Sequence, residues 1–153
     1  MAGMKLVSRL LSFKGFRAVN VWFEGRGRDA EIVVAVKPHK TGRRCPVCKR
    51  PGKIVRSTRP RRWRDVRVCG RRVTLLHTPR EIRCPTHGQH LEETPWAAPV
   101  ARVSYRLEYL LLRFCQAMPQ SVAAQMLGLA PSTLSDLLHR IIAMVGDTVK
   151  KVE

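Results

Sequence analysis

Two short stretches, Cys45-Pro46-Val47-Cys48 and Cys84-Pro85-Thr86-His87, decide how the middle of this sequence must fold. In each stretch two residues separate a pair of side chains that can bind a metal ion, and a glycine follows closely. Such a turn points both side chains at one tetrahedral ion, so three thiolates and one imidazole would fill the coordination sphere of Zn²⁺. Because no coordination position stays open, the sequence predicts one structural zinc per chain.

The 35 residues between Cys48 and Cys84 exceed the spacing of common zinc fingers but fit a β-hairpin inserted between the two pairs, as in a zinc ribbon. His90 stays open as a substitute for His87, although the spacing of His87 mirrors that of the first pair. Loss of the metal is expected to unfold residues 40–90 and to leave the helical part folded. The remaining thiols, Cys69 and Cys115, are predicted to be small hydrophobic or free side chains.

The charge of the chain is high and unevenly placed. With 29 Lys and Arg against 11 Asp and Glu the net charge is +18, and residues 37–90 alone carry +15. A single basic segment of this kind favours a polyanionic partner, either nucleic acid or an anionic surface. No apolar run approaches the length of a membrane span, so a transmembrane segment is not expected.

Residue patterns predict an α+β protein. A short amphipathic helix is expected within residues 4–13, a hairpin from strands 19–23 and 31–36, a second hairpin from strands 63–68 and 72–77, and a strand at 81–84. Helices are expected at 104–118, 121–127 and 131–149. These elements suggest four parts: an N-terminal helix and β-hairpin (1–36), a zinc-ribbon-like basic module (37–93), a proline-bracketed linker (94–101) and an all-α helix-turn-helix domain (102–153).

Residues 120–139 have the features of a helix-turn-helix. Ala124 lets two helices cross closely, Gly128 can adopt the positive φ of a tight turn, and Pro131 suits the first turn of the second helix. The packing positions are Ala123, Leu127, Leu129, Leu134 and Leu137. If the second helix enters the major groove, the side chains placed to contact bases are Ser132, Thr133, Ser135, Asp136 and His139, and Arg140 can reach a phosphate.

Taken together, these features resemble the N-terminal DNA-binding region of ISL-three type insertion-sequence transposases. The resemblance rests on the two Cys/His pairs, the strand Arg62-Trp63-Arg64-Asp65-Val66, Arg80 and Arg83, the Pro95-Trp96 segment and the terminal helix-turn-helix. It implies binding to the terminal inverted repeats of a mobile element. The RNase H-like catalytic domain of these transposases is not expected in this chain, so we do not expect an enzyme.

The expected partner is therefore double-stranded DNA, in the bacterial cytoplasm with the nucleoid, and neither a membrane nor a small-molecule substrate. The predicted backbone contacts are Arg59, Arg61, Arg62, Arg64, Arg67, Arg71, Arg72 and Arg140. Trp63 and Trp96 are expected to pack and not to stack on bases, since aromatic residues make up only 6% of the chain. Self-association through the C-terminal helix stays open, as does a free-standing zinc-dependent regulator that binds DNA or RNA.

Overall fold

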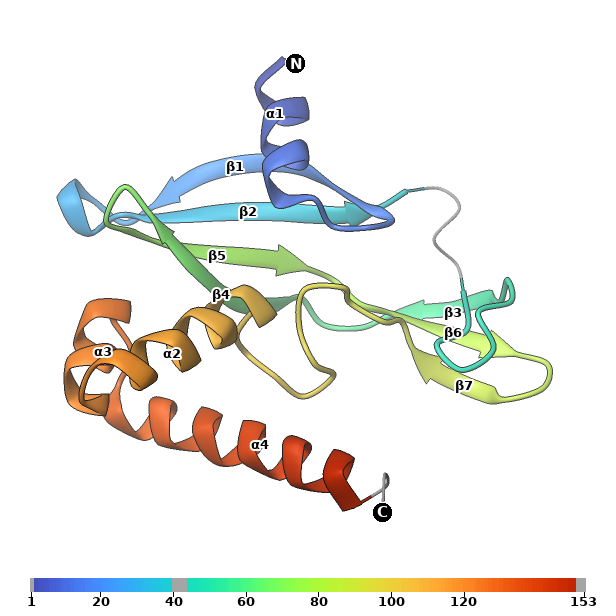
Figure 1. Ribbon diagram of the computed structural model, residues 1–153. Helices are drawn as coiled ribbons and strands as arrows, with labels where there is room; N and C mark the ends of the chain where they lie inside the picture. Colours follow the sequence, from blue (N-terminus) through green and yellow to red (C-terminus); the bar gives the residue numbers. More distant parts are fainter. Residues whose placement is uncertain (1, 40–43, 151–153) are drawn as a thin grey trace. The chain divides into compact units, whose positions relative to one another are not determined.

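A computed structural model describes residues 2–39 and 44–150 of the chain (Figure 1). The chain divides into two compact units, Met1–Tyr105 and Arg106–Glu153. All the strands described lie in the first unit and are followed by helices, which confirms the predicted α+β class. Residues 1, 40–43 and 151–153, which the sequence assigned to the first, second and fourth parts, lie outside the described residues.

A four-stranded sheet forms the body of the first unit. Its strands β1 (Phe16–Glu24), β2 (Glu31–Pro38), β4 (Arg61–Val68) and β5 (Arg71–His77) lie in the order β1-β2-β5-β4. Both predicted hairpins are confirmed, and a short 3-10 helix, η1 (Gly27–Asp29), lies in the first. Unexpectedly, the parallel pairing of β2 with β5 joins the two hairpins into one sheet.

Because β2 pairs with β5 in parallel, the first unit is not divided between residues 1–36 and 37–93 as the sequence suggested. Val33, Val34 and Val36 are each at most 4% exposed, so β2 is buried on both faces. A continuous apolar strand of this kind is typical of the interior of a sheet with a parallel neighbour and not of a free hairpin. The second hairpin thus belongs with the first.

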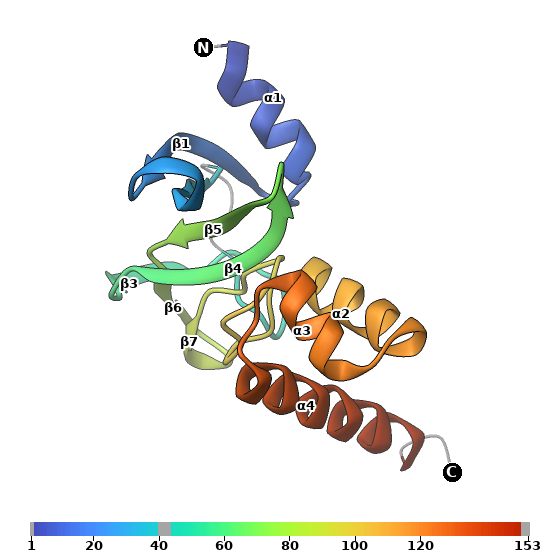
Figure 2. The same cartoon turned by 90° about the vertical axis from the view of Figure 1, so that its left-hand side faces the viewer.

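The core of the first unit lies on one face of this sheet, which we call the inner face. Val34, Val36, Trp63, Val73 and Leu75 project from the strands into it. Side chains of α1 (Ala2–Leu11) pack on the same cluster, and α1 lies beside β1 (Figures 1 and 2).

The segment predicted to be a linker, residues 94–101, completes this core. Trp96 is 2% exposed, and Ala97, Ala98 and Ala101 are also buried. The rings of Phe13, Phe16, Trp63 and His77 surround Trp96 with centroids 5.0–5.6 Å away. Residues 94–101 are therefore not a free linker, because the indole finds a closely packed apolar site. Trp63 and Trp96 are packing residues, as predicted.

A second, antiparallel sheet carries the Cys/His pairs. It contains β3 (Lys53–Ser57), β6 (Arg80–Cys84) and β7 (Gly88–Leu91) in the order β3-β6-β7. Figure 1 shows it beyond the end of β5; β6 and β7 follow β5 in the chain, whereas β3 precedes β4. The sequence predicted only β6 of these strands. Ile82 is the one apolar side chain of this sheet, apart from the cysteines, that is buried among the described residues.

The second unit is a helix-turn-helix with a preceding helix. Its helices are α2 (Tyr105–Ala117), α3 (Gln120–Leu127) and α4 (Pro131–Lys150), close to the predicted bounds. The five predicted packing positions, Ala123, Leu127, Leu129, Leu134 and Leu137, are all buried. Gly128 has φ 63°, and the amides of Gly128 and Leu129 donate to the carbonyls of Gln125 and Ala124, which closes the turn as a Schellman motif.

Among the described residues no helix is both long and apolar enough to cross a bilayer.

Candidate metal centre and nucleic-acid interface

The four predicted metal ligands meet at one point of the second sheet. Cys45 and Cys48 lie in the loop before β3, and Cys84 and His87 flank the turn between β6 and β7. One donor atom from each lies within 4.8 Å of all the others. The structure therefore brings the four predicted residues together, and the two pairs face each other.

The distances within this cluster fit a tetrahedral zinc site. His87 Nδ1 lies 3.9 Å from Cys45 Sγ and 3.7 Å from Cys84 Sγ, and Cys48 Sγ lies 3.7 Å from Cys84 Sγ. For ordinary zinc–sulfur and zinc–nitrogen bonds, the edges of a tetrahedron measure roughly 3.6–3.8 Å. These three separations fit a four-coordinate ion, and the other three are at most 4.8 Å, so the cluster could hold a metal ion.

Backbone groups favour the thiolate form of one ligand. The amides of His87 and Thr86 lower the pKa of the Cys84 thiol to about 6. Amides directed at sulfur are a usual support for zinc-bound cysteine, since they fix the ligand and stabilise its negative charge. Cys45 and Cys84 are buried, which shields two of the sulfurs from water.

Local geometry builds both turns. In the first, the amide of Cys45 donates to Arg50 O and the amide of Lys49 to Cys45 O, each at 2.9 Å, with Lys49 in the left-handed region at φ 60°. Gly52 then passes so close to β6 that a Cβ would clash with Ile82 Cγ2 and lie 3.0 Å from Arg83 O. Glycine is therefore required where the two ligand pairs approach each other.

His90 does not replace His87 in this cluster. Its Nε2 lies 2.6 Å from the backbone carbonyl of His87, and among the described residues the metal-binding group contains only Cys45, Cys48, Cys84 and His87. Cys69 is exposed in the hairpin turn and Cys115 is half-buried on α2, so neither joins the cluster.

A buried polar network, which the sequence did not reveal, connects the two sheets of the first unit. His77, at the end of β5, places Nδ1 2.9 Å from Val36 O and Nε2 2.7 Å from Glu92 Oε1. Arg80 donates to Glu92 Oε2 from Nε and Nη2 at 2.9 and 2.6 Å. Burial acts to raise the pKa of Glu92, but the hydrogen bonds from His77 and Arg80 outweigh it and the pKa is lowered.

Replacing Glu92 with Gln should destabilise the protein in a pH-dependent way. A lowered folded-state pKa gives stability that is complete above the unfolded value of about 4.3 and is lost as pH falls through the folded value. We expect a cost of about 2 kcal/mol at pH 7 that shrinks below about pH 4. Urea unfolding between pH 7 and 3 measures it.

The matched control is Glu93→Gln, because Glu93 is exposed and its one ion-pair partner in the described part of the chain is exposed Lys49. It should change stability little at any pH. Acid also weakens thiolate–metal binding, but equally in both variants. A difference between Glu92→Gln and wild type that stays constant down to pH 3 would show that the ionised carboxylate is not the stabilising form.

The side chains predicted to contact bases lie on α4. Ser132, Asp136 and His139 are exposed, and Thr133 and Ser135 are half-buried. Arg140 forms an ion pair with Glu108 of α2, and burial raises the pKa of Glu108 despite this partner. The first two turns of α4 therefore offer short polar groups, while Arg140 is engaged within the helical unit.

The other predicted phosphate-binding arginines fall into two groups. Arg62 binds Glu24 through two nitrogens at 2.6 and 2.8 Å, and Arg71 donates to the carbonyls of Gly27, Arg28 and Ala30. Arg61 makes a longer bond of 3.4 Å to Pro99 O. Arg59, Arg64, Arg67 and Arg72 donate no side-chain hydrogen bond among the described residues.

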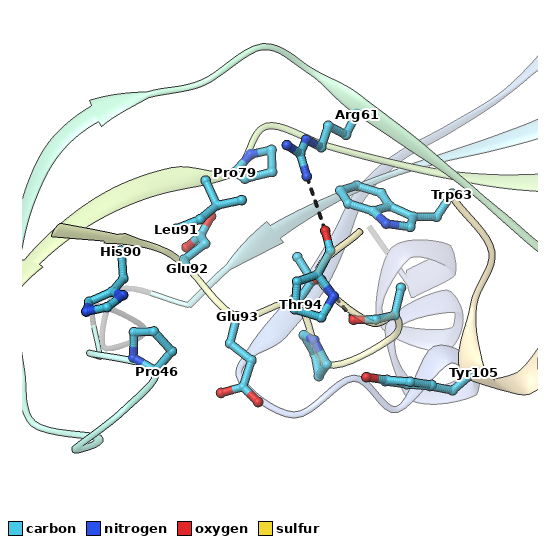
Figure 3. Close-up of a pocket in the computed structure, with 13 residues that line it drawn as sticks. Pro46, Arg61, Trp63, Pro79, His90, Leu91, Glu92, Glu93, Thr94 and Tyr105 are labelled. Carbon is cyan, nitrogen blue, oxygen red and sulfur yellow. Dashed lines mark hydrogen bonds between the residues drawn. The ribbon is translucent and has the colours of Figure 1, made fainter. Parts of the chain in front are cut away.

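A pocket of about 380 Å³ lies beside residues 90–99. Figure 3 shows the residues that line it. Trp63, Pro79 and Pro95 provide apolar walls, and Arg61 and Glu93 provide charge at its border. Both charges have partners, Pro99 O and Lys49. We assign no catalytic role to this pocket.

Comparison with known protein families gives one result. Residues 92–142 match the family model described as the helix-turn-helix domain of transposase family ISL3. The match spans the segment after β7, helices α2 and α3 and α4 as far as residue 142, and it indicates a DNA-binding helix-turn-helix in this part of the chain. The Cys/His cluster precedes the matched residues. No curated protein and no solved structure matched the chain.

Proposed function

Because residues 92–142 match the helix-turn-helix domain of transposase family ISL3, we propose that this chain binds the terminal inverted repeats of an insertion element. The observation that carries the proposal is this match, together with the exposed polar residues on the first turns of α4. A helix of this kind reads base edges in the major groove. Duplex DNA as partner also implies a location with the bacterial nucleoid.

The proposal includes one structural zinc ion per chain, held by Cys45, Cys48, Cys84 and His87. Supporting it are the 3.7–3.9 Å donor separations and the closed, four-ligand set of three thiols and one imidazole. When bound, the ion fixes the two turns and supplies folding free energy. The ion would lie in the basic module, where it would hold β3, β6 and β7 together and so fix the positions of the arginines on these strands.

We further propose that the two units divide the work of binding. The segment of residues 37–90, with a charge of +15, would supply affinity through phosphate contacts. Ser132, Thr133, Ser135, Asp136 and His139 would supply sequence choice, because phosphate contacts carry no direct sequence information. Arg62, Arg71 and Arg140 would have to exchange intramolecular partners to contact a phosphate, which makes them weaker candidates than Arg59, Arg64, Arg67 and Arg72.

Cutting and joining of DNA are not part of the proposed role of this chain. Transposition chemistry of the two-metal type needs converging carboxylates. Glu24, Glu81, Glu92, Glu93 and Glu108 are each paired with a basic side chain, which supports a binding function for the described residues.

The alternative is a free-standing zinc-dependent regulator that binds DNA or RNA. It is favoured by one observation: the family match covers residues 92–142, and the Cys/His cluster lies outside them. A transposase part should prefer the inverted-repeat ends over random duplex and RNA, whereas a free-standing regulator should not prefer those ends, so one binding assay separates the two functions.

Gel-shift titrations with the inverted-repeat ends, random duplex, single-stranded DNA and RNA test the proposal. Ser135→Ala should cost roughly 1–3 kcal/mol on the inverted repeat and little on random duplex. Ser57→Ala, at the exposed end of β3, is the matched control and should bind as wild type. A preference for RNA or single-stranded DNA, or an equal loss on both duplexes, would contradict the assignment.

A further inference from the structure

The β4–β5 hairpin gathers three arginines on the face of the four-stranded sheet opposite the core, which we call the outer face. Trp63 and Asp65 of β4 and Val73 and Leu75 of β5 are buried. Because side chains alternate along a strand, Arg64 and Arg72 project to the other side. Arg64 pairs with Thr74, which places Arg72 in the diagonal position two residues along β5.

A bulge brings the third arginine to the same place. Asp65 pairs with Val73 and Val68 with Arg71, so Val66 and Arg67 both stand opposite Arg72. Two residues facing one is the arrangement of a β-bulge, which redirects a side chain and increases the local twist. Arg67 and Arg72 are exposed, whereas Arg64 is half-buried.

Among the described residues no ion pair holds these three guanidinium groups, whereas two neighbouring arginines of the sheet have close partners. Neighbouring Arg62 is paired with Glu24, and Arg71 is held by three backbone carbonyls. Glu31, the carboxylate near Arg64, already accepts a hydrogen bond from Thr74. Burial lowers the pKa of Arg64, and Arg72 and Arg67 lower it further while Glu31 opposes them. Like charges thus meet with little compensation.

We propose that Arg64, Arg67 and Arg72 form a phosphate-binding site for the backbone of duplex DNA. This inference rests on the proposed DNA-binding function and names the residues that supply its sequence-independent part. Guanidinium groups bind phosphate through pairs of parallel hydrogen bonds, and a phosphate would relieve the repulsion among the three. Placement on paired strands holds the donors in position before binding, which reduces the entropic cost of binding.

Duplex DNA fits this face better than a single strand does. Across the sheet, Arg64 pairs with Thr74, Thr74 with Val33 and Val33 with Trp22, which form one row of residues. Trp22 lies on β1, the opposite edge strand of the sheet. Single-strand binding usually depends on several aromatic side chains on which successive bases stack. Thr74 and Val33 of this row are buried and Trp22 is half-buried, so the row does not provide such a surface.

The test uses the full chain and two double variants with equal charge loss. Arg67→Gln/Arg72→Gln removes two members of the site, and half-buried Arg64 is left in place. Arg56→Gln/Arg62→Gln removes two arginines of the same basic segment that are ion-paired with Glu81 and Glu24. Binding to a random duplex is measured between 50 and 200 mM salt, and thermal unfolding is measured without DNA.

We expect Arg67→Gln/Arg72→Gln to bind random duplex at least about tenfold more weakly than the wild type at low salt. The negative slope of log K against log salt should become less steep by about 1.8, or about 0.9 for each lost phosphate contact. It should unfold at or above the wild-type temperature, because repulsion is removed. For the control, Arg56→Gln/Arg62→Gln, the change in slope should be less than half of the change expected for the site variant. Equal slopes for the two variants, or stronger binding of single-stranded RNA through these arginines, would overturn the inference. Failure of the wild type to bind any duplex would instead overturn the proposed function.

Discussion

Replacing Cys45 with Ser, or removing metal with a strong chelator, is expected to unfold the β3-β6-β7 sheet and to leave the four-stranded sheet folded. Ile82 is the one buried apolar side chain of the small sheet besides the cysteines among the described residues. A core of this size cannot offset the conformational entropy of about 30 ordered residues. Structural zinc supplies roughly 10–16 kcal/mol in comparable small modules, so its loss should be decisive.

The structure predicts a smaller unfolded region after metal loss than the sequence alone did. Residues 40–90 were expected to unfold together, but strands β4 and β5 lie in the other sheet, where Trp63, Val73 and Leu75 join an independent core. Amide hydrogen exchange should therefore rise in residues 44–57 and 80–91 and much less in 61–77. Helices α3 and α4 should keep their protection, since their buried leucines do not depend on the metal.

Cys69→Ser is the matched control, because Cys69 is exposed in the β4–β5 turn and lies outside the cluster. It should leave metal content and exchange unchanged. Elemental analysis of protein purified without chelator should give one zinc per chain. Absence of zinc, or fast exchange in 61–77 to the same extent as in 80–91, would contradict the proposed structural role of the ion.

Local patterns in the sequence predicted most helices and strands because their causes are local. Alternation in Trp63–Val68, the Gly128 turn and the three- and four-residue spacing on α2 each depend on near neighbours. The cluster of Cys45, Cys48, Cys84 and His87 could also be predicted, since ligand spacing within each pair is a local property.

What the sequence did not reveal depends on distant contacts. Strands β3 and β7 are short and show no alternation, so their pairing with β6 depends on the turns that carry the Cys/His pairs. The parallel pairing of β2 with β5 needs residues more than 40 positions apart. Glu92 lies in a polar stretch, and only the fold shows that His77 and Arg80 enclose its carboxylate.

Replacing Trp96 with Ala should have the second large effect, a loss of about 3–5 kcal/mol from the stability of the first unit. Trp96 is 2% exposed and lies among Phe13, Phe16, Trp63 and His77. Its indole N–H finds no hydrogen-bond acceptor among the described residues, so the side chain contributes through packing alone. Truncation would leave a cavity that surrounding rings cannot fill without leaving their own contacts.

This experiment separates two interpretations of residues 94–101. A free linker tolerates such a change within about 0.5 kcal/mol, whereas a core residue accounts for a large part of a total stability of about 5–15 kcal/mol. Because the chain has two units, hydrogen exchange of the β2 and β5 amides is a better measure than a single unfolding midpoint. The control is Trp22→Ala, because Trp22 is only half-buried on the outer face, and this change should cost less stability than Trp96→Ala.

If Trp96→Ala and Trp22→Ala weaken β2 and β5 equally, residues 94–101 are not part of the core. If only Trp96→Ala does so, the segment before the helices belongs to the sheet, and the fold of the first unit depends on residues that the helix-turn-helix match also includes.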